Sequence, residues 1–339
     1  MLVLISSLSN ANTIDDIKEK GVLKCGVYRD IPGYSLNNEG IEIELCSAVS
    51  YAIFGKQDNF EAIGLDADLR FEAVKAGELD ISFASPVLNQ KRDLTKGVDF
   101  VAPYTYELQG LLAMKSFYNK ATLKLEDFSY KSFKDIKEEI SVCVAGDTII
   151  ESSFLKYMVK HAKGKVRIKP YYSFLGAKRA FLRKECSLLS DQIGVLKSML
   201  EMNEYFEPSI LLDDIIEVLP LYAMIKLGDN DFHYLIKNII NGLLLAEDKD
   251  INSKNIDEVL NNTKDKEILY MFGQIKGYGK SLGVNDDFLY KIVKNLGNYG
   301  EIFDKHLGEA SGHNASRGLN NLYKNGGLFY PFKVYGQEE

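Results

Sequence analysis

The first hundred residues alternate short apolar runs with segments in which apolar side chains recur at helical spacing. Residues 23–28 are typical of a strand, and the following segment keeps one apolar helical face up to Gly55, a residue type that commonly ends helices. Residues 69–84 repeat the form, with a helix ended by Gly77 and then a short buried strand. This alternation predicts a largely parallel sheet covered by helices over about residues 12–112.

A second block of strands and helices starts with a predicted strand at residues 140–144. A tight Ala-Gly-Asp-Thr turn follows, and residues 149–164 indicate a helix that ends at Gly164. Further short strands are predicted at residues 166–171 and 186–190, with a helical segment between them. This block can therefore form a sheet of its own.

Apolar connectors bracket the second block, at residues 108–116 on the way out and at residues 215–229 on the way back. The chain thus crosses between two lobes twice, which predicts a ligand cleft with a two-strand hinge. The expected lobes are residues 12–112 with 222–339 for lobe 1, and residues 113–221 for lobe 2. The amphipathic helix at residues 231–247 opens a helical C-terminal part that should pack on lobe 1.

Length and charge narrow the class of protein. A chain of 339 residues exceeds what one core usually serves, and no apolar stretch is long enough to cross a bilayer. A net charge of −7 disfavours nucleic acid as a partner, because phosphate binding needs clustered Lys and Arg. Residues 1–11 resemble the late part of a secretory signal without its charged beginning, with a frayed apolar N-terminus as the alternative. We expect an exported, soluble monomer.

The four cysteines fall into two couples, Cys25 with Cys46 and Cys143 with Cys186. An even number suits an oxidising compartment, and each couple joins elements expected to be neighbours in one sheet-and-helix layer. We predict one disulfide in each lobe, with four buried free thiols as the alternative. The cysteines lack metal-ligand spacing and the four histidines are scattered, so neither a metal site nor a cofactor is expected.

Several motifs, distributed over nearly the whole chain, resemble those of a known family: TIDDIKEKGVLKCGV, ELCSAVSYAIFG, LRFEAVKAGELDISFA, VCVAGDT and NYGEIFDKHLGEASGHNASRGLNNLYKNGGLFYP. Together they resemble the general L-amino-acid-binding proteins of polar-amino-acid ABC transporters, within the amino-acid solute-binding protein superfamily. The resemblance implies an α/β protein of the two-lobed, type II periplasmic-binding-protein fold with a helical C-terminal extension. It also implies a periplasmic protein that closes over one free L-amino acid and delivers it to membrane permease subunits.

The resemblance places ligand-binding residues in both lobes. Arg92 matches the family arginine that grips the α-carboxylate, and a planar guanidinium can hold both oxygens at once. Asp191 matches the acidic residue that receives the ammonium group, with a helix N-cap as its alternative role. The backbone N–H groups of Asp147 and Thr148 would present a partly positive helix end to the ligand carboxylate, and simple helix capping is the alternative.

The segment Ser85-Pro86-Val87 departs from the family pattern. The family has polar residues here that border the ligand, whereas Pro86 removes an N–H and Val87 replaces a polar group. Backbone contacts at Ser85 and Val87 are still expected. Three further residues match the segment that covers the ligand side chain, with ordinary turn and core roles as the alternative: Tyr28, Ile31 and Tyr34.

Two other functions stay open. Some relatives in the superfamily are dehydratases of small cyclic acids, which would require a general acid or base in the cleft. No histidine lies near the candidate positions in the sequence and no Gly-x-Ser-x-Gly motif is present, so we expect a protein without enzymatic activity. The third possibility is a receptor or degenerate binder that keeps the fold, and the altered Ser85-Pro86-Val87 segment is compatible with it.

Overall fold

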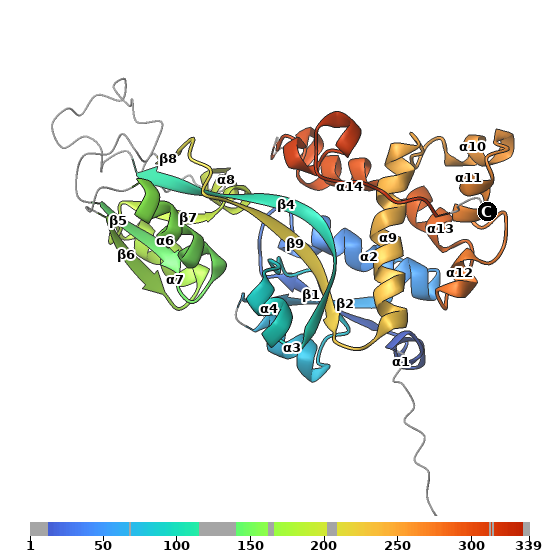
Figure 1. The fold of residues 1–339 in the computed structure, drawn as a ribbon, viewed down its shortest axis with the longest axis horizontal. Coiled ribbons are helices and arrows are strands. Elements are labelled where there is room, and N and C mark those ends of the chain that lie inside the picture. Colours follow the sequence, from blue (N-terminus) through green and yellow to red (C-terminus); the bar gives the residue numbers. More distant parts are fainter. Residues whose placement is uncertain are drawn as a thin grey trace, which may run out of the picture. The chain divides into compact units, whose positions relative to one another are not determined.

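The structure is a computed structural model that describes residues 13–67, 69–114, 140–161, 166–201, 209–311, 313 and 315–334. The expected signal segment at residues 1–11 lies outside the described residues. Residue contacts divide the chain into two compact units: Met1–Leu65, Leu69–Tyr104 and Tyr222–Glu339 form the first, and Asp66–Asp68 with Thr105–Leu221 form the second. Two strands contribute to both units and lie side by side, β4 (Val98–Met114) and β9 (Glu217–Lys226) (Figure 1).

The first unit is built around β1 (Leu23–Tyr28), which matches the predicted strand. It pairs in parallel with β2 (Phe60–Leu65) on one side and with β3 (Ile81–Ser82) on the other. The third strand is shorter than the apolar run that predicted it, because only two of its residues find partners in β1. On its far side β3 pairs antiparallel with β9.

Helices flank these strands, and two of them, at residues 41–54 and 70–76, lie where the apolar periodicity predicted them. The first unit contains α1 (Thr13–Lys20), α2 (Ile41–Phe54), α3 (Arg70–Ala76) and α4 (Gln90–Thr95). Both predicted helix stops are confirmed, since Gly55 and Gly77 follow α2 and α3 in the left-handed conformation, with φ of 69° and 76°. Gly40 begins α2 with φ of 135°, and a Cβ there would lie 2.1 Å from the carbonyl carbon of Tyr34.

The C-terminal part of the chain is helical, as the resemblance implied. It contains α9 (Asn230–Asp248), α10 (Ile256–Asn262), α11 (Lys266–Met271), α12 (Tyr278–Ser281), α13 (Phe288–Leu296) and α14 (Tyr299–His306). Helices α13 and α14 pack against both α9 and α2, so this extension becomes part of the core of the first unit (Figure 1). A salt bridge between Arg317 and Glu247, with N–O distances of 3.0 and 3.1 Å, fastens its later residues to α9.

The strands of the second unit continue the sheet of the first, because β9 pairs with β4 and β4 pairs with β7 (Leu188–Gln192), so they do not form the separate sheet that the sequence predicted. Here β5 (Ile140–Ala145) pairs in parallel with β6 (Val166–Tyr171) and β7, while β4 pairs antiparallel with β7 and with β8 (Ser209–Leu211). Its helices are α6 (Ile149–His161), α7 (Phe174–Leu182) and α8 (Ile193–Glu201). The predicted stop of α6 at Gly164 falls outside the described residues.

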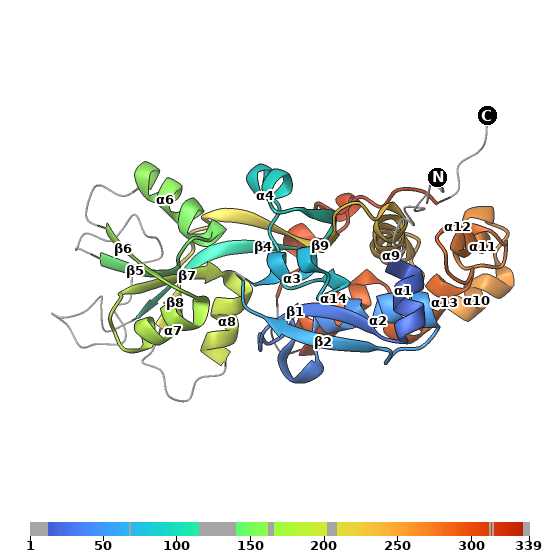
Figure 2. The ribbon, with the colours of Figure 1, turned by 90° about the horizontal axis from the view of Figure 1, so that it is seen from below.

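Apolar clusters cover both faces of the sheet in the second unit. Successive residues of β4 alternate between the faces, so Leu111 joins Phe154 of α6 in one cluster, while Leu112 joins Phe181 of α7 in the other. Figure 2 shows α6 and α7 on opposite sides of the strands. The central strand β5 is buried along most of its length, and its sequence, Ile-Ser-Val-Cys-Val-Ala, is accordingly almost continuously apolar.

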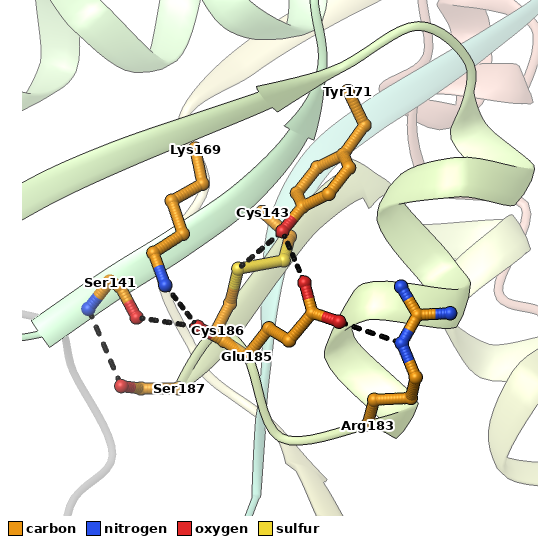
Figure 3. Close-up of a disulfide and its surroundings, with 8 residues drawn as sticks. All are labelled: Ser141, Cys143, Lys169, Tyr171, Arg183, Glu185, Cys186 and Ser187. Atoms are coloured by element: carbon orange, nitrogen blue, oxygen red, sulfur yellow. Dashed lines mark hydrogen bonds and ion pairs between the residues drawn. A yellow bond between two sulfur atoms is a disulfide. The ribbon is translucent and has the colours of Figure 1, made fainter.

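Both predicted disulfides are present and none of the four cysteines is free. Cys25 in β1 joins Cys46 in α2 with a Cα–Cα distance of 6.0 Å, and Cys143 in β5 joins Cys186 with 5.6 Å. Each bond therefore links a strand to a neighbouring element within one unit. Figure 3 shows the second bond beneath Tyr171, whose hydroxyl lies 4.0 Å from the sulfur of Cys186.

Polar groups close over that second disulfide. Glu185 accepts hydrogen bonds from the hydroxyl of Tyr171 at 3.0 Å and from Nε of Arg183 at 2.6 Å (Figure 3). These bonds, that from Arg183 first, lower the pKa of Glu185 below its usual value. The carboxylate of Glu185 thus joins the last residue of β6 to the end of α7, beside the disulfide.

Candidate functional site

Arg92, the predicted carboxylate ligand, lies on the short helix α4 in the first unit. The side chain of Asn89 caps this helix by accepting from the backbone N–H of Arg92 at 2.9 Å. The guanidinium Nη1 donates to the carbonyl of Val87 at 2.9 Å, which orients the group. Since this bond uses one of five N–H donors, four remain without a hydrogen bond to the described residues. This arrangement suits an oxyanion.

The surroundings of Arg92 are cationic. Its guanidinium carbon lies 5.2 Å from the ring centroid of Phe71, and the same ring is approached by Arg70 at 5.3 Å and Lys96 at 5.2 Å. Burial, together with repulsion from Arg70, lowers the pKa of Arg92 to about 10. Arg92 is therefore still charged at neutral pH, and a bound anion would relieve both effects.

Ser85 and Val87, the two predicted border residues, are both buried. Ser85 has a φ of 49°, an uncommon value for a residue other than glycine. Its carbonyl accepts from Nη1 of Arg70 at 2.8 Å, and the same nitrogen donates to the carbonyl of Ala84 at 2.5 Å. The hydroxyl of Ser85 donates a hydrogen bond to the carboxylate of Glu42 at 2.9 Å, so its side chain points into the protein interior.

Glu42 is a residue that the sequence analysis missed. It lies in the first turn of α2, is fully buried, and accepts hydrogen bonds from Tyr28, Ser85 and Tyr104. Burial raises the pKa of its carboxyl group to about 7, although the four hydrogen bonds act to lower it. An acidic residue in the first turn of a helix is ordinary, so the only signal in the sequence was its position between Ile41 and Ile43.

The segment predicted to cover the ligand side chain is tightly folded. Tyr28 ends β1, and its backbone N–H donates to Glu42 at 2.6 Å. The carbonyl of Ile31 accepts from three consecutive backbone N–H groups, beginning with that of Tyr34 at 3.1 Å. Tyr34 is only 1% exposed, which agrees with the core role that the sequence left open for it. The segment and the Ser85 loop meet at Glu42.

Asp191, the predicted ammonium ligand, lies within β7 of the second unit and is 4% exposed. Its Oδ1 accepts from the backbone N–H of Gln192 at 2.7 Å. Glu107 approaches the first turn of α8, where its carboxylate accepts from the N–H of Gly194 at 3.4 Å.

Asp147 and Thr148 occupy the turn between β5 and α6. The hydroxyl of Thr148 donates to the carbonyl of Ala145 at 2.7 Å and accepts from the N–H of Glu151 at 3.4 Å. The backbone N–H of Asp147 donates to the carboxylate of Glu151 at 2.8 Å. These bonds are those of a helix cap, the alternative that the sequence left open, and they involve both predicted residues.

Gln109 ties these two parts of the second unit together and was also missed. Its amide nitrogen donates to the carbonyl of Ile150 at 2.8 Å and to the hydroxyl of Ser190 at 3.0 Å, while its oxygen accepts from Ser153. The start of α6 and the strand that carries Asp191 are thereby fixed to each other. A lone polar residue in the apolar run Leu-Gln-Gly-Leu-Leu was the signal in the sequence.

The described residues contain no group of three or more His, Cys, Asp and Glu side chains that could hold a metal ion. Among the same residues, no helix is long and apolar enough to cross a membrane. The candidate chemistry therefore consists of a guanidinium and backbone groups in the first unit, and of a carboxylate and a helix N-terminus in the second.

No protein-family model matches this chain. Curated relatives match it over nearly its whole length. The amino-acid ABC transporter-binding protein YhdW of Escherichia coli K12 is 28% identical over 97% of this chain and 94% of its own length. The general L-amino acid-binding periplasmic protein AapJ of Rhizobium johnstonii is 27% identical over 97% of this chain and 95% of its own length.

Solved structures agree with the relatives. A periplasmic binding protein of an ABC transporter from Brucella ovis, solved with glutathione bound, superposes with a TM-score of 0.87 at 26% identity, covering 96% of this chain and 100% of that one. An ancestral amino-acid-binding protein described as a precursor of cyclohexadienyl dehydratase reaches a TM-score of 0.55 at 20% identity over 71% of this chain and 96% of that one, which shows the fold alone.

These comparisons confirm the predicted fold class, a mixed α/β protein of the type II periplasmic-binding-protein fold. They also agree with the resemblance on which the site residues were assigned. This chain is thus similar, over nearly its whole length, to the binding proteins of amino-acid ABC transporters.

Proposed function

We propose that this protein is the substrate-binding component of an ABC transporter, which captures free L-amino acids in the periplasm and delivers them to the membrane permease. The observation that carries the proposal is the state of Arg92. It is a desolvated guanidinium, oriented by the carbonyl of Val87, with most of its donors available to an oxyanion. The full-length relatives named for amino-acid transport support the same function.

In the proposed complex the ligand is held by opposite charges from the two units. Arg92 of the first unit binds the α-carboxylate, and Asp191 of the second unit receives the ammonium group. The N-terminus of α6, at Asp147 and Thr148, adds a partly positive helix end. The zwitterion thus bridges two lobes, and closure of the cleft between them strengthens both charge-assisted hydrogen bonds by excluding water.

The hinge in this proposal consists of the two crossing strands, β4 and β9. We propose that the lobes, residues 12–112 with 222–339 and residues 113–221, move as bodies about these strands when a ligand binds. Small-angle scattering of the protein with and without a saturating amino acid should show compaction. An unchanged profile at saturation would contradict closure.

The proposal is that of a binding protein without enzymatic activity. A dehydratase would need a general acid or base that reaches the ligand. The carboxyl group with a pKa near 7, that of Glu42, is enclosed by hydrogen bonds from Tyr28, Ser85 and Tyr104, which argues against such a role. A search for turnover of any stabilising ligand separates the two functions.

The cellular location is proposed on two grounds. Both curated relatives are binding proteins of transporters, and one is named as periplasmic. The two disulfides suit an oxidising compartment outside the cytoplasm. In the periplasm the protein would deliver its ligand to the permease subunits at the inner membrane. We also propose that it works as a monomer.

The decisive experiment is a thermal-shift screen of the twenty L-amino acids, with glutathione included because the similar Brucella ovis protein holds it. Calorimetry on Arg92→Ala and Asp191→Asn then tests the site. Loss of either side chain leaves a charge of the ligand unpaired in a desolvated site, so the binding free energy should become less favourable by roughly 2–5 kcal/mol.

Two exposed residues provide matched controls. Arg183→Ala removes an exposed guanidinium of the second unit, and Asp213→Asn neutralises an exposed carboxylate. Both should bind with wild-type affinity. Near-normal binding by Arg92→Ala or Asp191→Asn would reject the site. A screen in which no amino acid stabilises the protein would favour the receptor or degenerate binder, with Ser85-Pro86-Val87 as the altered segment.

A further inference from the structure

The carboxyl group of Glu42 joins three separate segments of the first unit. Its Oε2 accepts from the backbone N–H of Tyr28, at the end of β1, at 2.6 Å. Its Oε1 accepts from the backbone N–H of Ser85 at 3.1 Å, from the hydroxyl of Ser85 at 2.9 Å and from the hydroxyl of Tyr104 on β4 at 2.7 Å. A fully buried side chain therefore acts as the common acceptor for four donors.

The segments that Glu42 joins carry the candidate ligand contacts. Tyr28 opens the segment proposed to cover the ligand side chain. Ser85 lies two residues before Val87, whose carbonyl orients Arg92. The backbone of Ser85 has a φ of 49°, and such a conformation persists only where the surroundings hold it.

Ser85 is held from two sides. The backbone N–H of Ser85 donates both to the carboxylate of Glu42 and to the hydroxyl oxygen of Tyr104. On the other side, the guanidinium of Arg70 donates to the carbonyls of Ala84 and Ser85. Arg70 comes from α3, whereas Glu42 comes from α2, so two helices fix one short loop between them. Removing the hydrogen bonds of either Glu42 or Arg70 should allow the loop to relax toward an ordinary backbone conformation.

We propose that Glu42 is a positioning residue of the amino-acid site, which holds Tyr28 and the Ser85-Pro86-Val87 backbone in the conformation that presents Arg92 to the ligand carboxylate. The inference rests on the proposed function. Glu42 acts through its neighbours, because its own oxygens are occupied by Tyr28, Ser85 and Tyr104.

A carboxylate is better suited to this role than an amide. All four groups around Glu42 can donate a hydrogen bond, and above its pKa of about 7 the side chain of Glu42 is a carboxylate, which only accepts. In Glu42→Gln one oxygen is replaced by an NH₂ group, which must face a backbone N–H of Tyr28 or of Ser85. The size of the side chain is kept, so this substitution tests hydrogen bonding rather than packing.

The chain offers a matched control two residues further along the same helix. Glu44 is also buried, but its carboxylate is paired with Lys305 at 2.7 Å and lies 3.3 Å from His306, both in α14. Glu44→Gln therefore disturbs a buried acid of α2 without touching the candidate ligand segments.

Calorimetric titrations are run at a pH of about 8.5, where Glu42 is ionised, with an acidic, a polar and a small apolar probe: L-glutamate, L-glutamine and L-alanine. For a probe that the wild type binds, Glu42→Gln should weaken binding by about tenfold or more, since a buried donor loses its acceptor. Glu44→Gln should bind within about twofold of wild type. Tyr104→Phe, which keeps the ring and removes one donor, should show a smaller loss in the same direction and serves if Glu42→Gln does not fold.

Hydrogen exchange of the ligand-free proteins gives a second readout. A peptide that covers residues 82–88 should exchange faster in Glu42→Gln than in wild type and in Glu44→Gln. Unchanged exchange there, or equal losses of affinity in the two glutamate variants, would overturn the positioning role. A wild type that binds none of the three probes would count against the proposed function, and the exchange comparison would still decide whether Glu42 positions the loop.

Discussion

The hydroxyl of Tyr299 in α14 donates a hydrogen bond of 2.9 Å to the backbone carbonyl of Tyr104 in β4, across 195 residues of sequence. Both residues are buried. The ring of Tyr299 also meets that of Phe329 at 4.9 Å, and the guanidinium of Arg317 lies over it at 5.2 Å. The C-terminal extension is thereby fixed to β4, the strand whose Tyr104 donates a hydrogen bond to Glu42.

Loss of this bond should weaken the first unit. Tyr299→Phe keeps the ring and leaves the carbonyl of Tyr104 without its partner, which should lower the free energy of unfolding by about 1 kcal/mol. Urea denaturation followed by circular dichroism measures it, since the chain contains no tryptophan. Tyr323→Phe, at a half-exposed ring, should have no effect, and equal midpoints for the two variants would contradict the prediction.

Glu44 should contribute stability that disappears in acid. Burial opposes its ionisation, but the contacts from His306 and Lys305 more than offset that effect, so its pKa lies below the usual value. A lowered pKa stabilises the folded state above the ordinary pKa of 4.5, and this stability is lost as pH falls through the folded value. Glu44→Gln should therefore cost about 1–2 kcal/mol at pH 7 and progressively less below pH 4.5.

Urea midpoints between pH 7 and pH 3 check this dependence. The exposed Glu258→Gln is the control and should follow the wild type throughout. A difference between Glu44→Gln and wild type that stays constant down to pH 3 would show that the carboxylate charge is not responsible.

Glu42 should have the opposite pH dependence. Burial raises its pKa from 4.5 to about 7, against the hydrogen bonds from Tyr28, Tyr104 and Ser85. A raised pKa gives stability that is complete below 4.5 and is lost as pH rises through about 7. Relative to Glu42→Gln, the wild type should lose roughly 3 kcal/mol over this window. Parallel stability curves for the two proteins would contradict a raised pKa.

The two disulfides should stabilise their units by similar amounts. They close loops with sequence separations of 21 and 43, which correspond to about 3 and about 4 kcal/mol in the chain-entropy picture. Replacing Cys143 and Cys186 by serine should lower stability slightly more than replacing Cys25 and Cys46. Denaturation of each double variant measures it, with non-reducing peptide mapping to check the remaining bond. A pair whose loss leaves the midpoint unchanged would contradict the estimate.

Much of the fold could be predicted from local patterns. The apolar pattern predicted the extent of β1 and α2. Gly55 and Gly77 marked the ends of α2 and α3, because glycine adopts the left-handed conformation most easily. The couples Cys25–Cys46 and Cys143–Cys186 were predicted because strand and helix neighbours follow from that order. These features depend on residues close in sequence, or on one step of the α/β pattern.

The candidate site was only partly predictable. Arg92 was found through the resemblance, and its bond to Val87 spans five residues. Glu42 was not found, since the partners that distinguish it from any acidic residue in a first helical turn lie 43 and 62 residues away, at Ser85 and Tyr104. Such contacts depend on how the strands are ordered in the sheet.

The sequence by itself thus determined the alternation of strands and helices and the cysteine pairing, and its resemblance to a family singled out Arg92 as a candidate ligand residue. The tertiary structure alone decided which polar groups are buried together, such as Glu42 with Ser85 and Gln109 with Ser190. The physical reason is that burial and hydrogen bonding set the protonation and orientation of a side chain, and both arise only when distant segments pack against each other.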